Sequence, residues 1–182
     1  MDLERIDRLE QNLTIALAEI DRLKSLEDIR DCIRRVCRGI DRIDEKLLRS
    51  AFHADATINM GKIYNGGLDD WIASALKHQK TQSQRQHVPA SIRVQTDGDE
   101  AVVETYELDR HKSPMHGGVS DLVLAARTLD RLVRRNGEWK IVARVKVMDW
   151  GRTITADELV YDNSPLQRGG DDETDPSYLL FP

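Results

Sequence analysis

The sequence lacks the features that mark several classes of protein. Acidic residues outnumber basic ones, and the formal net charge of −5 argues against a nucleic-acid partner, because phosphate binding requires a basic surface. No run of about 18 apolar residues occurs, so no membrane-spanning helix is predicted. The first five residues are mostly charged and hold no apolar signal core. We therefore expect a cytoplasmic protein.

Cysteine is scarce, and so is any metal-binding pattern. Cys32 and Cys37 are the two cysteines, and they lie five positions apart on one predicted helix, which makes a disulfide between them unfavourable. Apolar neighbours indicate buried thiols of a reducing compartment. His111 and His116, with Asp109, lie in a predicted polar loop, but their spacing matches no closed zinc pattern. We therefore expect no metal.

The first half of the chain has helical periodicity. Residues 2–24 carry apolar side chains at both seam positions of three heptads, which is typical of a helix that packs along another helix. Ser25 and Asp28 indicate a capping box that would open a second helix, and Asp44 is predicted to cap a short third one. A fourth helix is predicted over 69–78. The heptad seam comprises Ile6, Leu13 and Ile20 at one position, and Leu9, Ala16 and Leu23 at the other.

Strands dominate the second half. Asp-Gly and Asn-Gly turns join two pairs of alternating segments, which predicts two hairpins. Helices followed by antiparallel strands indicate an α+β fold, in which a curved sheet wrapped by helices leaves a pocket at its mouth. The expected strands are 56–64, closed by a turn at 65–67, then 91–95, 101–108, 122–134 and 138–148, with a polar loop at 109–120. The expected units are an N-terminal helix (1–24), one domain (25–150) and a C-terminal extension (151–182) whose apolar end, 178–181, docks on the protein.

Several short motifs resemble those of one family. Residues 25–150 are similar to the SnoaL-like, nuclear-transport-factor-2-like proteins, which implies a cone-shaped half-barrel with curved antiparallel strands around an apolar pocket. Within that family the pattern is closest to the branch of scytalone dehydratase and lindane dehydrochlorinase, which works without a metal or organic cofactor. The matching segments are 39–41 with Asp44, 87–91, 98–101, 104–106, 127–131, 137–141, Arg144, 149–150 and 175–178.

The resemblance implies three catalytic residues. The branch uses an Asp–His pair, and its Asp and His match Asp41 and His87. An arginine in the last strand matches Arg144, although the alternation of apolar residues places Arg144 on the polar face of that strand, so Arg127 is an alternative. Val36 stands where the dehydrochlorinase has a pocket lysine, which argues against dehydrochlorination. From the residues alone, a histidine paired with a buried carboxylate makes a general base near neutral pH.

Other side chains are candidates for contacting a substrate. Tyr64 and Tyr106 could donate hydrogen bonds to a substrate oxygen, and His111 and His116 could lie at the rim of the pocket. His53 and His78 are interpreted as surface residues of helices. The candidate apolar walls are Trp71, Met60, Phe52, Met148 and Trp150.

These observations predict a cofactor-independent lyase for a small, hydrophobic, ring-containing molecule. Dehydration is the first expectation, and loss of a small carbonyl fragment from a lignin-derived dimer uses the same groups, which would place the protein in the catabolism of aromatic compounds. The alternatives are an isomerase or polyketide cyclase, or a non-catalytic binding protein similar to the small subunit of a ring-hydroxylating dioxygenase. The heptad helix and the exposed sheet face predict a homo-oligomer, a trimer before a dimer.

Overall fold

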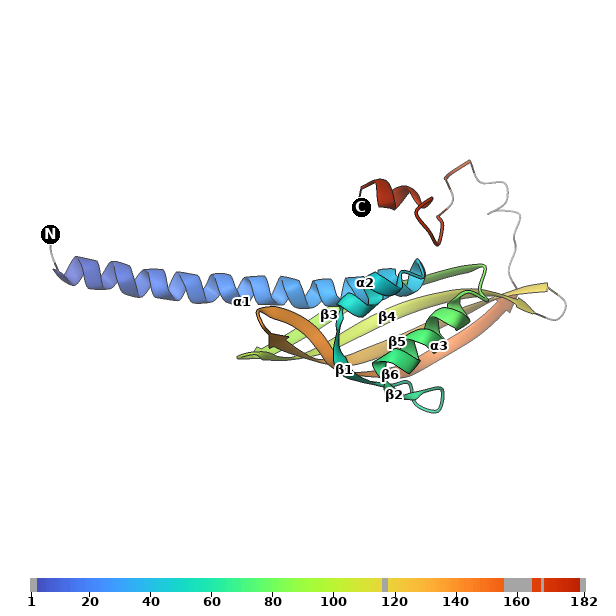
Figure 1. Cartoon of the computed structure of the whole chain (residues 1–182), viewed down its shortest axis with the longest axis horizontal. Coiled ribbons are helices and arrows are strands. Elements are labelled where there is room, and N and C mark those ends of the chain that lie inside the picture. Colours follow the sequence, from blue (N-terminus) through green and yellow to red (C-terminus); the bar gives the residue numbers. More distant parts are fainter. Residues whose placement is uncertain (1–2, 116–117, 156–164, 168, 181–182) are drawn as a thin grey trace.

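A computed structural model describes residues 3–115, 118–155, 165–167 and 169–180 of the chain (Figure 1). Helices come first and a long run of strands follows, as the sequence predicted. The elements are α1 (Leu3–Asp41), α2 (Glu45–Ser50), β1 (Phe52–Asn59), β2 (Asn65–Gly67), α3 (Leu68–Gln79), β3 (Gln84–Asp97), β4 (Glu100–Met115), β5 (Gly118–Arg135), β6 (Glu138–Thr155) and the short 3₁₀ helix η1 (Pro176–Leu179). Within the described residues, no helix is long and apolar enough to cross a membrane.

One curved, unclosed sheet of six strands forms the framework, in the order β2-β1-β6-β5-β4-β3. Neighbouring strands are antiparallel except β1 and β6, which run parallel. The sheet is therefore mixed, and the expectation of a purely antiparallel sheet is corrected at this one junction. The predicted α+β half-barrel is otherwise confirmed.

The three α-helices cover one face of the sheet (Figure 1). The buried residues of α1 begin at Ser25, and they pack with apolar side chains of α2, α3 and the inner face of the sheet. The largest fully buried side chains include Ile29, Ile33, Leu48, Ile58, Ile72, Leu132 and Ile141. Burial of this apolar surface supplies the main favourable contribution to folding.

α1 is one uninterrupted helix, which corrects the predicted break at Ser25. No proline occurs between Leu3 and Asp41, and Gly39 lies only in the last turn, so nothing stops the helix at the polar pair of Ser25 and Asp28. Ser25 is buried, and its hydroxyl accepts a hydrogen bond from Arg134 at 3.4 Å. The first half of α1 projects beyond the sheet (Figure 1), and its apolar side chains are exposed.

Two local predictions about the first strands are wrong. β1 spans Phe52–Asn59 rather than 56–64, and the predicted turn at 65–67 is β2, which pairs with β1. The reversal lies at residues 60–64, where Gly61 adopts a positive φ of 62° that suits glycine. Asp44 caps α2 as expected, since its side chain accepts the Leu47 N–H at 2.8 Å.

Both hairpins form at the predicted turns, but their strands are longer than predicted. Gly98 and Gly137 adopt the positive φ angles that such turns require. Residues 109–115 and 118–120 continue β4 and β5, so the expected polar loop is strand. Polarity was a poor guide to a loop here, because Asp109 and His111 line a cavity instead of facing solvent.

A bulge in β6 decides which side chains face inward. Leu132 pairs with Ile141 and Arg131 pairs with Ala143, so Val142 is an extra residue. Because side chains alternate along a strand, this insertion reverses the faces beyond it. Val145 therefore faces outward at 37% exposure, whereas Arg144 is buried. The predicted single apolar face of β6 is wrong for this reason.

The C-terminal segment docks on the end of α1. The Tyr178 hydroxyl donates to Asp44 at 3.3 Å, and the Arg38 guanidinium lies 5.3 Å from the centre of its ring. Arg85 bridges the segment to the helix, donating to Asp171 and to the Asp41 carbonyl oxygen. Docking of the tail is confirmed at Tyr178, whereas Leu179 and Leu180 are exposed. Phe181 lies outside the described residues.

Candidate active site

A cavity of about 540 Å³ lies between the helices and the inner face of the sheet, within the usual range for a small-molecule site. Its charged groups, together with His87 and His111, lie on β3, β4 and β6. Its apolar lining comes from α1, α3, β5, β6 and the segment after β1. The lining includes Val36, Ile40, Met60, Ile63, Tyr64, Trp71, Leu122, Leu124, Ala126 and Met148.

Asp41 and His87 form a hydrogen-bonded pair at this cavity. Nδ1 of His87 lies 2.7 Å from Oδ1 of Asp41, and the same carboxylate accepts the backbone N–H of His87 at 3.0 and 3.1 Å. Asp41 ends α1, where a negative charge faces the unfavourable end of the helix dipole, and these donors offset that cost. The carboxylate accepts the Nδ1 proton, which leaves the lone pair of Nε2 free.

His111 stands beside His87 on the neighbouring strand. The two rings meet edge to face, with centroids 4.9 Å apart. Nδ1 of His111 lies 2.7 Å from the Gln82 side-chain oxygen, so this ring also carries its proton on Nδ1. Burial, with smaller effects of nearby cationic groups including His87 and Lys146, lowers the pKa of His111 to about 4. His111 is therefore a neutral imidazole at physiological pH.

A buried cluster of one cation and two carboxylates lies next to the histidines. Nζ of Lys146 lies 2.9 Å from Glu107 and 2.5 Å from Asp109. Burial disfavours charge on both Glu107 and Lys146, but their mutual attraction outweighs it: the pKa of Glu107 falls and the pKa of Lys146 rises. Lys146 thus presents an ammonium group at the cavity wall.

Arg144 reaches the cavity as a bidentate partner of a buried carboxylate. Its Nε and Nη2 donate to Asp130 at 2.7 and 2.8 Å, and both side chains are almost fully buried. The guanidinium also lies 5.6 Å from the centre of the Phe52 ring. Burial opposes ionisation of Arg144, but Asp130 outweighs this effect and raises its pKa, so the arginine stays charged.

The structure brings some predicted substrate contacts together and separates others. Tyr64, Trp71, Met60 and Met148 line the cavity, although the Tyr64 hydroxyl is already engaged with the Gly67 carbonyl at 2.6 Å. The other described candidates do not line it. Phe52 is core packing beneath Trp71 and Arg144; Tyr106 and Trp150 are about half exposed on the outer face; Arg127 pairs there with Asp149 and Glu104; and His116 lies outside the described residues.

The sequence reasoning placed His111 at the rim of the pocket but did not identify Glu107, Asp109 or Lys146 as part of the cavity wall. Glu107, Asp109 and His111 alternate along β4 and are all buried on the same face, a period-two signal that was present in the sequence. It was overlooked because the strand was predicted to stop at 108. Lys146 was missed through the β6 bulge. His78 is exposed on α3, as interpreted, and also lines the cavity. His53 lies in β1 rather than in a helix, and its Nε2 contacts the Val133 carbonyl oxygen.

Both cysteines are buried and free, as predicted. Burial is the main cause that raises the pKa of the Cys32 thiol to about 11 and that of Cys37 to about 12. Cys37 lines the cavity, yet such a thiol is a poor nucleophile near neutral pH.

The family model of the SnoaL-like domain matches residues 21–145, which include both members of the Asp41–His87 pair and Arg144. The chain belongs to the SnoaL-like family. No curated protein sequence matches it. Among solved structures, this SnoaL-like chain resembles a type 2 hexachlorocyclohexane dehydrochlorinase at 20% identity, with a TM-score of 0.65 over 76% of this chain and 95% of the other.

Two proteins of Novosphingobium aromaticivorans are similar to the same degree. One is named as a candidate scytalone dehydratase, with 17% identity and a TM-score of 0.66 over 76% of this chain and 93% of the other. The second is described as a nuclear-transport-factor-2-like protein with a cystatin-like fold, with 18% identity and a TM-score of 0.66 over 75% of this chain and 90% of the other. At these identities the likeness establishes the fold and leaves the reaction to the site itself.

Proposed function

We propose that this SnoaL-like protein is a lyase that dehydrates a small, hydrophobic, ring-containing molecule by acid–base catalysis. The observation that carries the proposal is the 2.7 Å contact of Asp41 with Nδ1 of His87, at the wall of a largely apolar cavity. It fixes one tautomer of the imidazole, so Nε2 is the atom that can take a proton.

The reaction requires a proton acceptor, a proton donor and a group that stabilises negative charge. Nε2 of His87 would remove a proton from a carbon next to a carbonyl group, and Asp41 would stabilise the imidazolium that forms. The same imidazolium would then give its proton to the β-hydroxyl group, which leaves as water with the C–O bonding pair. Lys146 and Arg144 would stabilise the transient charge on the carbonyl oxygen, since both present cationic groups at the cavity.

The cavity also supports the proposed class of substrate. Its volume suits one molecule of one to a few rings, and Trp71, Met60 and Met148 offer apolar contact surface. The same groups could release a small carbonyl fragment from a lignin-derived dimer, in keeping with a role in the catabolism of aromatic compounds. The two buried, unpaired thiols fit a reducing compartment, and we propose the cytoplasm.

A close Asp–His contact would not be expected in a non-catalytic binding protein, so the geometry favours an enzyme. An isomerase or cyclase would use the same base without a leaving group. Product analysis therefore distinguishes a dehydratase from these alternatives. We propose an assay of purified protein with cyclic β-hydroxy ketones in D₂O, followed by NMR. A dehydratase releases water and forms the conjugated ketone, whereas an isomerase moves or exchanges a proton and a cyclase forms a ring bond, both without loss of water.

The matched variants are His87→Gln and His53→Gln. His53 lies in β1 outside the cavity lining and contacts the Val133 carbonyl oxygen, so it controls for the loss of an imidazole. We expect turnover to vanish in the first variant and to persist in the second. Tight binding of ring compounds without turnover or exchange in the wild-type protein would contradict the enzymatic proposal.

We also propose a homo-oligomer, a trimer before a dimer. The outer face of the sheet exposes a group of apolar side chains that a second copy would cover. This group comprises Val88, Val102, Tyr106, Leu108, Leu129, Val145 and Trp150. Trp139 and Ile141 of β6 belong to the core and are not part of this group. The exposed heptad seam of α1 offers a second contact.

A further inference from the structure

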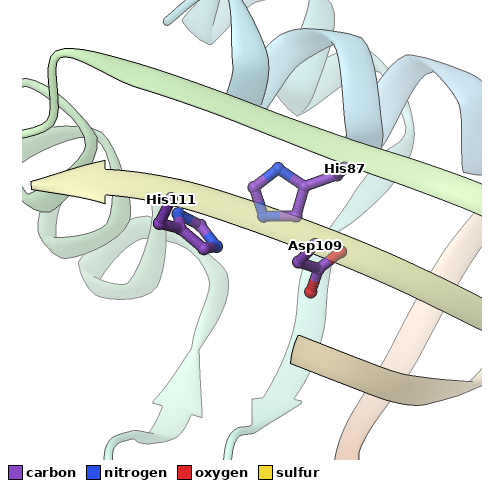
Figure 2. A group of neighbouring side chains, drawn as sticks. All are labelled: His87, Asp109 and His111. Carbon is purple, nitrogen blue, oxygen red and sulfur yellow. The ribbon is translucent and has the colours of Figure 1, made fainter. Parts of the chain in front are cut away.

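Three potential metal ligands converge on one point of the cavity wall. One ligand atom each from His87, Asp109 and His111 lies within 4.8 Å of the others (Figure 2). The sheet register fixes this arrangement, because His87 pairs with Asp109 across β3 and β4. His111 follows Asp109 by two residues, so its side chain points to the same face.

The hydrogen bonds around the three side chains leave metal-binding lone pairs free. Asp41 and the Gln82 side-chain oxygen accept the Nδ1 protons of His87 and His111, so both Nε2 atoms are unprotonated acceptors. Metal-binding histidines are commonly oriented in this way, by a carboxylate or carbonyl oxygen on the nitrogen that does not bind the metal. Asp41 already holds the His87 ring in this way, and Gln82 holds the His111 ring.

Asp109 supplies the third ligand. Its side chain is fully buried, and one carboxylate oxygen contacts Lys146, whereas Oδ1 is buried without a hydrogen-bond partner in the described structure. A buried acceptor without a donor costs free energy, and two further acceptors lie close by. A cation placed between the three acceptors would relieve this cost.

We propose that His87, Asp109 and His111 bind a divalent transition-metal ion, with two imidazole nitrogens and one carboxylate oxygen as ligands. Such a set suits ions like Zn²⁺, Co²⁺ or Fe²⁺ rather than Mg²⁺ or Ca²⁺, which prefer oxygen. The three ligands leave coordination positions open to the cavity. The sequence spacing did not reveal this site, because one ligand comes from the neighbouring strand.

Metal binding and the proposed acid–base chemistry exclude each other, since both use Nε2 of His87. An ion on this atom would remove the base, so occupancy would switch off the lyase. This consequence rests on the proposed function, but the binding site itself does not. The two claims can therefore fail separately.

The experiment is a Co²⁺ titration of the full-length protein after dialysis against a chelator, read by visible d–d absorption and by equilibrium dialysis. We expect one Co²⁺ per chain. His111→Gln and Asp109→Asn should each weaken binding by about 10-fold or more, whereas His53→Gln should bind normally. Circular dichroism would verify that each variant is folded, and Asp109→Asn preserves the shape of the side chain if His111→Gln does not fold.

The outcomes separate the two claims. Absence of Co²⁺ binding at micromolar concentrations, or binding that both ligand variants leave unchanged, would overturn the site. If the site binds metal, Zn²⁺ should inhibit the lyase and a chelator should restore activity. Activity that needs added metal would keep the site and overturn both the metal-free mechanism and the proposed inhibition.

Discussion

Asp41 and His87 are joined twice, through the imidazole Nδ1 and through the backbone N–H of His87. The carboxylate at the end of α1 therefore fixes both the strand position and the ring orientation of the histidine. Replacing the carboxylate by an amide keeps the size of the side chain but removes its preference for the Nδ1–H tautomer. The variant Asp41→Asn tests that relationship directly.

We expect Asp41→Asn to reduce kcat by about 10²- to 10⁴-fold with a smaller change in KM, because the general base is lost while the apolar walls remain. Steady-state kinetics on the cyclic hydroxy ketones would measure this change. Asp44→Asn is a suitable control, because Asp44 caps α2 outside the cavity lining. Equal effects of the two substitutions would contradict a specific role of Asp41.

The buried pair of Arg144 and Asp130 should be important for stability. Asp130→Ala would leave a buried guanidinium without its partner, and we expect a loss of about 3–5 kcal/mol in the free energy of unfolding. Urea denaturation at neutral pH measures it. The double variant Asp130→Leu with Arg144→Met should regain much of the loss, because neither charge then remains buried. If the double variant instead loses at least as much free energy of unfolding as Asp130→Ala, the unpaired guanidinium is not the cause of the loss.

The heptad seam of α1 should mediate association. Leu13 lies at a seam position and is 59% exposed, whereas Ile15 is 62% exposed but lies off the seam. We expect Leu13→Glu to lower the mass measured by light scattering and Ile15→Glu to leave it unchanged, since only the former places charge in a helix contact. A monomeric wild-type protein at micromolar concentration would contradict self-association altogether.

Both thiols should be inert in the folded protein. Because burial raises their pKa values to about 11 and about 12, the thiolate fraction at pH 8 is very small. We expect mass spectrometry to find no alkylation of Cys32 or Cys37 by iodoacetamide at pH 8, and two adducts per chain after unfolding in guanidinium. Rapid labelling of Cys37 in the folded state would indicate that the cavity opens widely.

The sequence predicted the features that depend on local signals. The hairpins at Gly98 and Gly137, the cap at Asp44 and the α+β order follow from turn chemistry and periodicity, and the positions of Asp41 and His87 follow from the family resemblance. The pairing of β1 with β6 and the bulge at Val142 depend on contacts between distant segments. Such contacts leave no local pattern, which explains why the alternation of residues alone did not predict the inward orientation of Arg144 and Lys146.

The bulge at Val142 makes the chemistry of the cavity depend on how β6 pairs with β5 as well as on its residues. If Val142 were paired in regular alternation instead of bulged, the two faces of the strand would be exchanged from 143 onward. Val145 and Val147 would then line the cavity, and the cations of Arg144 and Lys146 would face outward, leaving Asp130, Glu107 and Asp109 without counter-ions. Loss of the extra residue at 142 would instead keep Arg144 opposite Asp130, so a shorter β6 should still direct both cations into the cavity.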